Sequence, residues 1–141
     1  MAGTFTKKSI TQEAARAIVV AAEAKAKQKG MVFAIAIVDA EGALKAFSRM
    51  DGCGLLSVQV SQDKAWTSIS IGASGMDFWN MIKGDEMLKS FVPQIPRMAA
   101  VGGGVPIRTK AGEMVGGIGV SGGTTDDDNE VALAALQVFV D

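Results

Sequence analysis

One stretch, Val101–Gly123, constrains the fold more than any other part of this 141-residue chain. It reads VGGGVPIRTKAGEMVGGIGVSGG and holds nine of the 17 glycines in the sequence. Glycine weakens helices and strands, so this density indicates positive φ angles, tight turns or a close approach of the backbone to another group. We therefore expect the binding site of the protein to be built against this segment.

The composition indicates one globular domain that spans residues 1–141. Lys and Arg number 14 against 15 Asp and Glu, and no basic stripe with interleaved aromatic residues is present, which argues against a nucleic-acid partner. No stretch has the length and apolarity of a signal peptide or a membrane span, so we expect no membrane partner. The single cysteine, Cys53, excludes an intramolecular disulfide and predicts a cytoplasmic protein.

The chain contains no histidine and no tyrosine, and this absence limits its chemistry. Histidine-based triads, His-containing zinc sites and imidazole acid–base catalysis are excluded, and we predict no metal site. Any proton transfer must involve Asp, Glu, Lys, Cys53, a hydroxyl group or water. A bound haem would need Cys53, a methionine, a lysine or another weaker ligand in place of the usual histidine.

Helices are predicted near both ends of the chain. Thr11–Lys29 begins with Thr11 as N-cap and is followed by Gly30, and Thr124–Val140 begins with Thr124 or Thr125 before an acidic run. Alternating or continuous apolar runs predict five strands, which are Met31–Val38, Leu44–Ser48, Met98–Val101, Val105–Thr109 and Glu113–Val120. Turns at Asp39–Gly42 and Lys110–Gly112 predict two hairpins.

The middle of the chain is harder to interpret. Leu55–Ile71 has alternating β-branched residues, but its length favours a helix. That helix would place Lys64 within a mostly apolar stripe, where a lysine either extends outward or serves a site. In the irregular segment Gly72–Pro96 we expect a short helix near Asp77–Lys83 and then a loop, with Trp79 and other apolar residues forming a pocket wall or contacting a partner subunit.

Several motifs suggest chemistry, with different strength. Arg49 and Asp51 lie two residues apart on one strand face, so they form either a structural ion pair or a site in which Arg49 holds an anion and Asp51 accepts a proton. Gly117–Gly122 matches a dinucleotide fingerprint, but no parallel strand follows it. Asp126–Asn129 lacks the spacing of a calcium loop, and Gly102–Gly104 lacks the lysine of a phosphate loop.

Taken in order, the motifs resemble the GlcG/HbpS-like family, which includes the C-terminal domain of PduO-type adenosyltransferases. The resemblance spans nearly the whole chain and is carried by Asp39 with Gly42, Arg49–Gly52, Lys64–Ala65, Gly103–Ile107, Gly112, Gly116–Gly123 and Asp128. It implies an α+β fold with a five-stranded antiparallel sheet in a profilin-like α/β/α arrangement. It also implies haem, tetrapyrrole or corrinoid binding and a dimer-based homo-oligomer, such as a tetramer or octamer.

Two functional hypotheses use the family's motif positions, which are Arg49, Asp51, Lys64, Ser121 and Asp128. In the first, a pocket near the glycine-rich strands and a subunit edge binds a small molecule or cofactor. Arg49 or Lys64 pairs with a carboxylate of the ligand. The walls of the pocket are formed by Gly103, Gly104, Pro106 and Trp79. In the second, the protein is a cofactor-independent isomerase, lyase or hydrolase acting on a small oxygenated metabolite. Asp51 or Asp128 is then the base, Lys64 the acid, and Ser121 positions the substrate. A third interpretation is an accessory subunit without a ligand.

Overall fold

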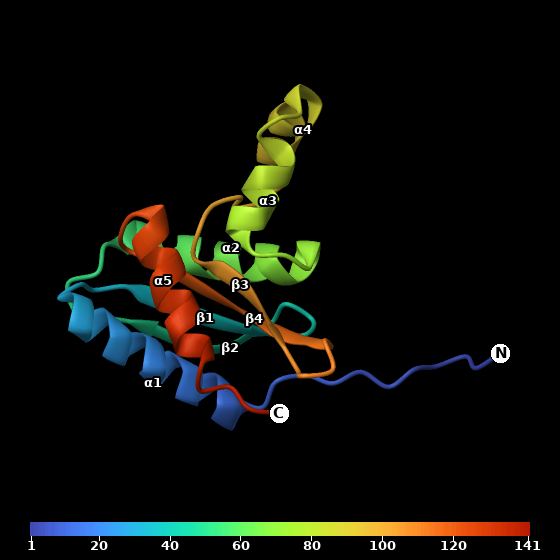
Figure 1. Ribbon diagram of the computed structural model, residues 1–141, viewed down its shortest axis with the longest axis horizontal. Coiled ribbons are helices and arrows are strands. Elements are labelled where there is room, and N and C mark those ends of the chain that lie inside the picture. Colours follow the sequence, from blue (N-terminus) through green and yellow to red (C-terminus); the bar gives the residue numbers. More distant parts are fainter.

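The computed structural model describes residues 1–141 and shows an α+β fold (Figure 1). The strands are β1 (Ala34–Asp39), β2 (Leu44–Arg49), β3 (Gly104–Arg108) and β4 (Met114–Ser121). The helices are α1 (Gln12–Lys29), α2 (Leu55–Ile71), α3 (Gly75–Ile82), α4 (Glu86–Phe91) and α5 (Thr125–Leu136), with a short 3₁₀ helix at Val92–Gln94. No helix is both long enough and apolar enough to span a membrane.

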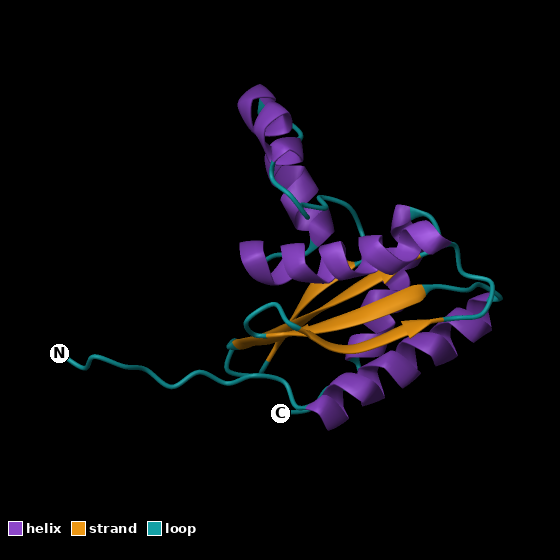
Figure 2. Ribbon diagram, turned by 180° about the vertical axis from the view of Figure 1, so that it is seen from behind, coloured by secondary structure: helices purple, strands orange, loops and turns teal.

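The four strands form one antiparallel sheet in the order β2-β1-β4-β3. Helix α2 covers one face of this sheet, and helices α1 and α5 lie side by side on the other face (Figure 2). The sheet is therefore the middle layer of three.

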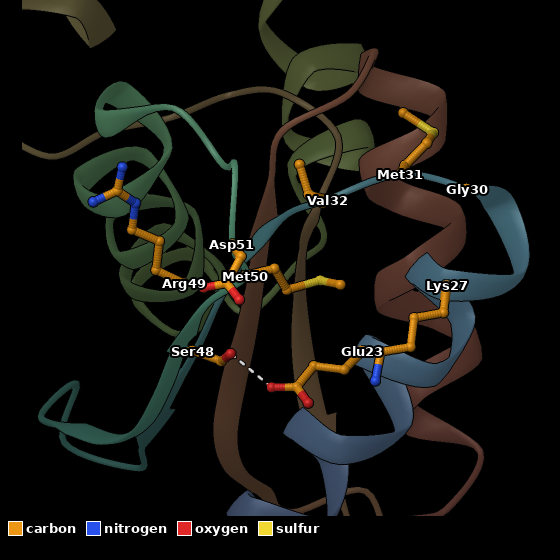
Figure 3. A pocket seen from close by; sticks show the side chains of 9 residues that line it. All are labelled: Glu23, Lys27, Gly30, Met31, Val32, Ser48, Arg49, Met50 and Asp51. Carbon is orange, nitrogen blue, oxygen red and sulfur yellow. Dashed lines mark hydrogen bonds between the residues drawn. The ribbon is translucent and has the colours of Figure 1, made fainter.

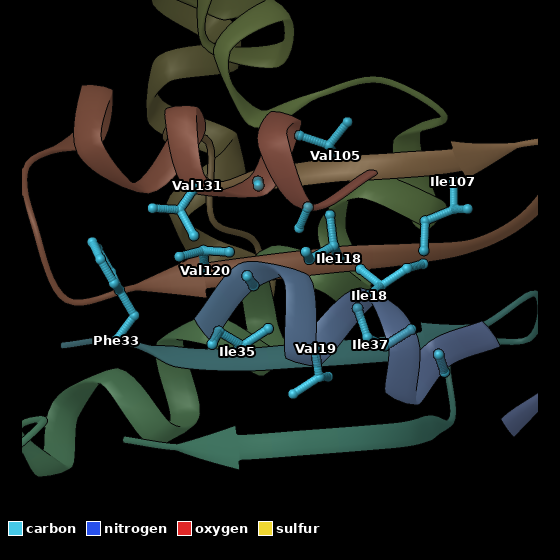
Figure 4. Packing of buried hydrophobic residues seen from close by; sticks show 14 of the residues in the cluster. Ile18, Val19, Phe33, Ile35, Ile37, Val105, Ile107, Ile118, Val120 and Val131 are labelled. Atoms are coloured by element: carbon cyan, nitrogen blue, oxygen red, sulfur yellow. The ribbon is translucent and has the colours of Figure 1, made fainter. Parts of the chain in front are cut away.

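Successive residues of a strand point to opposite faces, and each central strand presents most of its large side chains to one layer and mainly small ones to the other. Ile35 and Ile37 of β1, with Ile118 and Val120 of β4, enter the main core beneath α1 and α5 (Figure 4). Ala36 of β1 instead faces α2, and so do the glycines that alternate with the large residues of β4. The hydrophobic core thus lies almost entirely on the α1 and α5 side of the sheet.

Glycine lets α2 approach the other face closely. A Cβ atom added to Gly119 would lie 1.8 Å from the carbonyl oxygen of Ser61, and one added to Gly104 would lie 2.5 Å from that of Lys64. The helix contributes small residues to this contact, chiefly Ser57, Ser61, Ala65 and Ser68. The sequence predicted an open pocket wall along these glycines; this prediction is wrong for the face that α2 occupies.

The predicted terminal helices and hairpins are confirmed. The Thr11 side chain caps α1, and Gly30 ends that helix at a φ of 67°. Thr124 caps α5 in a reciprocal capping box with Asp127. The hairpin pairs β1–β2 and β3–β4 occur as expected, and α2 is a helix over the whole predicted range.

The predicted fifth strand, Met98–Val101, is wrong, so the sheet has four strands rather than five. Arg97 has a φ of 71°, and the backbone amides after it bond to nearby turn carbonyls or to a side chain rather than to a neighbouring strand. Thr67 of α2 accepts a hydrogen bond from the Ala99 amide at 2.9 Å and donates one to the Arg97 carbonyl oxygen, also at 2.9 Å. An apolar run that satisfies its backbone groups in this way cannot join the ladder.

Three further sequence expectations fail in detail. The mostly apolar stripe predicted around Lys64 on α2 is only partly buried, since Leu56 is 79% exposed while Lys64 and Thr67 are buried. The loop expected after Lys83 contains α4, which Asp85 caps by accepting hydrogen bonds from the Met87 and Leu88 amides. Helix α5 ends at Leu136 rather than continuing to Val140.

Helices α3 and α4 with the 3₁₀ helix form a segment, residues 75–94, that projects away from the three layers (Figure 1). We call this segment the arm. Its own small core consists of Phe78, Ile82 and Val92. Other apolar side chains of the arm remain exposed, namely Trp79, Met81, Met87, Leu88 and Phe91.

The close contact between α2 and the sheet predicts a large effect of a single methyl group. Gly119→Ala should destabilise the protein by about 3 kcal/mol, because its Cβ cannot fit against the Ser61 carbonyl without moving the helix. Urea unfolding followed by circular dichroism measures this difference. Gly84→Ala is the matched control, since no atom lies within 4 Å of its added Cβ. Equal unfolding midpoints for the two variants would contradict the close packing described here.

Candidate functional site

The largest cavity, about 570 Å³, lies where the end of α1 meets the end of β2 (Figure 3). We call it the α1–β2 cavity. Helix α1 contributes two charged residues to it, the connection into β1 contributes an apolar pair after Gly30, and β2 and the turn after it contribute the rest. Its lining residues are Glu23, Lys27, Gly30, Met31, Val32, Ser48, Arg49, Met50 and Asp51.

Two glycine turns shape this cavity. Gly30 adopts the left-handed conformation that ends α1, and the following Met31 amide bonds back to the Ala26 carbonyl at 3.0 Å. On the opposite side the Cys53 amide donates to the Met50 carbonyl at 3.0 Å, which closes a turn around Gly52 at a φ of 88°. Both turns redirect the chain, so residues from α1, β1 and β2 border one opening.

The polar groups of the cavity are partly engaged. Ser48 Oγ donates a hydrogen bond to Glu23 Oε1 at 2.6 Å, and Arg49 Nε donates one to the Cys53 carbonyl oxygen at 3.0 Å (Figure 3 shows the first). Lys27 and Arg49 bring positive charge to the lining, and Glu23 and Asp51 bring negative charge. The cavity therefore offers cations on both sides of an apolar middle formed by Val32 and Met50.

Lys64 and Asp128 occupy a different place, in the interior between α2 and α5. Lys64 Nζ lies 2.7 Å from Asp128 Oδ2, and the two side chains are only 3% and 5% exposed. Lys64 Nζ also donates to the Val120 carbonyl oxygen at 2.9 Å, and the Gly123 amide donates to Asp128 Oδ1 at 2.8 Å. Every hydrogen-bonding atom of these two buried side chains has a partner.

This ion pair depends on Gly103, where an added Cβ would lie 3.0 Å from Lys64 Nζ and 2.9 Å from Asp128 Cβ. Burial raises the pKa of Asp128, and the hydrogen bond and charge of Lys64 offset part of that rise. Burial therefore has a larger effect on the pKa of Asp128 than the opposing effect of Lys64.

The remaining predicted site residues lie in three further positions. Ser121 is buried, and its hydroxyl donates to that of Ser57 at 3.2 Å. Gly104 and Pro106 belong to β3, where Gly104 contacts α2. Trp79 lies on the arm and lines a separate cavity of about 250 Å³, together with Ile82, Lys89, Val92, Pro93, Met98 and Ala100.

Of the nine residues predicted to form one site, the structure brings only Arg49 and Asp51 into the α1–β2 cavity. Sequence reasoning missed the other lining residues. One signal for them was available: Glu23 and Lys27 are four residues apart on one helix face, just before the glycine that ends the helix. No three His, Cys, Asp or Glu side chains of the chain converge as they would around a metal ion.

Comparison with known proteins gives consistent results. The chain is 34% identical over 116 residues to the protein GlcG of Escherichia coli, which covers 82% of this chain and 84% of GlcG. A crystal structure of an HbpS double mutant from Streptomyces reticuli superimposes with a TM-score of 0.87 at 30% identity, over 99% of this chain and 93% of that one. A complex of PduOC with heme shares the fold, with a TM-score of 0.85 at 23% identity over 93% and 95% of the two chains.

A family described as "Haem degrading protein HbpS-like" matches residues 10–137, which is nearly the whole of the three-layer fold. The match includes α1, both glycine turns of the cavity and the buried ion pair. The chain therefore belongs to the HbpS-like family.

Proposed function

We propose that this protein binds a tetrapyrrole-like ligand such as haem in the α1–β2 cavity. The observation that carries the proposal is the lining of that cavity, which joins an apolar middle to the two cations Lys27 and Arg49. Its volume of about 570 Å³ lies within the usual range for cofactor sites. The family description, which names haem degradation, supports the same class of ligand.

The residues fit the two parts of such a ligand. A haem has a flat apolar ring and two carboxylates, and the ring suits Val32 and Met50, while the carboxylates suit Lys27 and Arg49. Arg49 keeps its terminal guanidinium nitrogens available, because its contact with Cys53 uses Nε. When bound, haem supplies a redox-active iron; the chain's own residues bind the ring and orient it through its carboxylates.

The alternative of a cofactor-independent enzyme finds less support. Asp51 borders the cavity and could accept a proton there, but Lys64 and Asp128 are bound to each other in the interior, where a substrate has no access. We propose that these two residues hold α2 and α5 together rather than act as an acid–base couple. Ser121, bound to Ser57, belongs to the same interior.

We further propose that the arm joins copies of this chain into a homo-oligomer. The arm projects from the three layers (Figures 1 and 2). Phe78, Ile82 and Val92 pack with residues at its base, but five other apolar side chains of the arm stay exposed. Met87 is 80% exposed and Phe91 is 55% exposed. Exposed apolar groups gathered on one projecting segment are typical of a contact surface.

The charge of the cavity gives the first test of ligand binding. Lys27→Glu should weaken the binding of metal-free protoporphyrin about tenfold, because a carboxylate of the ligand then meets a negative charge. Fluorescence titration at low ionic strength measures the dissociation constant. Lys110→Glu makes the same change of net charge in the exposed turn between β3 and β4 and should have no effect. Equal weakening in both variants would refute the cavity as the binding site.

The buried ion pair predicts a specific order of stabilities at neutral pH. Lys64→Met should cost about 3–5 kcal/mol, because it leaves a buried carboxylate without a cation. Lys64→Met combined with Asp128→Asn should recover most of this loss, since the amide oxygen can still accept from Gly123. Urea unfolding of the two variants and the wild type measures the differences. A catalytic couple without structural importance would leave all three equally stable.

The same variants predict a dependence on pH. The pKa of Asp128 is raised in the folded protein, so folding favours its protonated form. The stability that Asp128 contributes is therefore complete below the ordinary pKa of aspartate and is lost as the pH rises through the raised pKa. Lys64→Met should widen this window upward, since it removes the cation that lowers that pKa. The double variant has no carboxyl group at position 128, so it should lose the pH dependence that Asp128 causes. Urea unfolding curves recorded at several values between about pH 4 and pH 8 measure this difference.

The proposed role of the arm is tested by oligomer mass. Met87→Ser with Phe91→Ser should lower the mass seen by analytical ultracentrifugation, while the circular dichroism spectrum stays that of the folded chain. Val20→Ser replaces an apolar residue that is 64% exposed on α1 and serves as the control. If the control dissociates the oligomer and the arm variant does not, the subunits meet at α1 instead.

A further inference from the structure

A haem in the α1–β2 cavity would need an iron ligand from this chain, and this inference rests on the function proposed above. The chain has no histidine and no tyrosine. Its only thiol, Cys53, is 2% exposed and does not line the cavity. The sulfur atoms that do reach the cavity lining belong to two methionines, Met31 and Met50.

The two methionines point in different directions. Figure 3 shows the Met50 side chain extending into the middle of the cavity, toward the side of α1 that carries Glu23 and Lys27. The Met31 side chain turns away toward the start of α5, and its Cε atom would lie 2.7 Å from a Cβ added to Gly123. Of the two thioethers, only that of Met50 therefore faces the space a ligand would fill.

The other donors in the cavity have different partners or suit different groups. Glu23 accepts the hydrogen bond of Ser48, and Arg49 cannot act as a ligand while it is protonated. Lys27 is placed to pair with a carboxylate of the ligand, as an ammonium does. Asp51 is a hard oxygen donor at the exposed turn, whereas the thioether of Met50 is the soft donor that haem iron accepts in cytochromes.

The backbone of Met50 is fixed on both sides, which holds its side chain in place. Its amide donates to the Phe33 carbonyl oxygen at 3.1 Å, and its carbonyl accepts from the Cys53 amide at 3.0 Å. Part of the side chain packs against the main core. A ligand held by a rigid turn and a packed core keeps its direction when the cofactor enters.

We propose that the thioether sulfur of Met50 is the protein ligand to the iron of a haem bound in the α1–β2 cavity. Thioether ligation favours ferrous over ferric iron, because the sulfur is neutral and soft. The assignment therefore predicts a protein that binds ferrous haem more tightly than ferric haem.

The test compares the wild type, Met50→Leu and the matched control Met31→Leu, each titrated with ferric haem, ferrous haem and metal-free protoporphyrin. Both substitutions conserve volume and apolarity, and protoporphyrin has no iron to ligate, so all three proteins should bind it equally. Met50→Leu should lose the sulfur-to-iron charge-transfer band in the absorption and magnetic circular dichroism spectra of ferric haem. Its preference for ferrous haem should fall about tenfold, while Met31→Leu should match the wild type.

The outcomes separate the ligand assignment from the proposed function. If Met50→Leu keeps the charge-transfer band and the ferrous preference, or if Met31→Leu loses them instead, the assignment to Met50 is overturned while protoporphyrin binding still supports the site. The assignment is also overturned if the wild type binds protoporphyrin and haem but shows no thioether band. If the wild type binds none of the three probes, the proposed function fails and the assignment fails with it.

Discussion

The close contact between α2 and the glycine face of the sheet determines the rest of the structure. Because Gly104 and Gly119 carry no side chains, the helix backbone lies against the strands. At this distance its inner face must be small, which explains the buried serines and the exposed Leu55 and Leu56. The same closeness brings Lys64 past Gly103 to Asp128, so the ion pair between α2 and α5 is a consequence of the glycines.

The proposed binding cavity is built independently of this contact. The α1–β2 cavity lies at the end of α1, and its shape comes from the turns at Gly30 and Gly52. The glycine-rich stretch Val101–Gly123 contributes none of the cavity's lining residues. The glycines that allow close packing and the glycines that shape the α1–β2 cavity are thus different residues in this chain.

Local signals in the sequence predicted most helices and strands, but they could not predict which residues pack against one another in the folded chain. The caps at Thr11, Gly30 and Thr124 act within a few residues, and those helices and turns are confirmed. The burial of serines on α2 was not predicted, because it depends on the glycines of the strands opposite, which only the folded chain brings there. Arg49 and Asp51 were found through a local motif, whereas Glu23, Lys27 and Met50 come together only through the folded chain.

The residues that hold the layers of this chain together are separate from those of the proposed site. Lys64, Asp128 and Gly119 lie in the interior, and none of them lines the cavity. A chain without histidine can therefore keep the fold of the HbpS-like family, because no histidine is needed for its packing. The chain offers no imidazole, so iron ligation in the proposed site would depend on another side chain, which we propose is that of Met50.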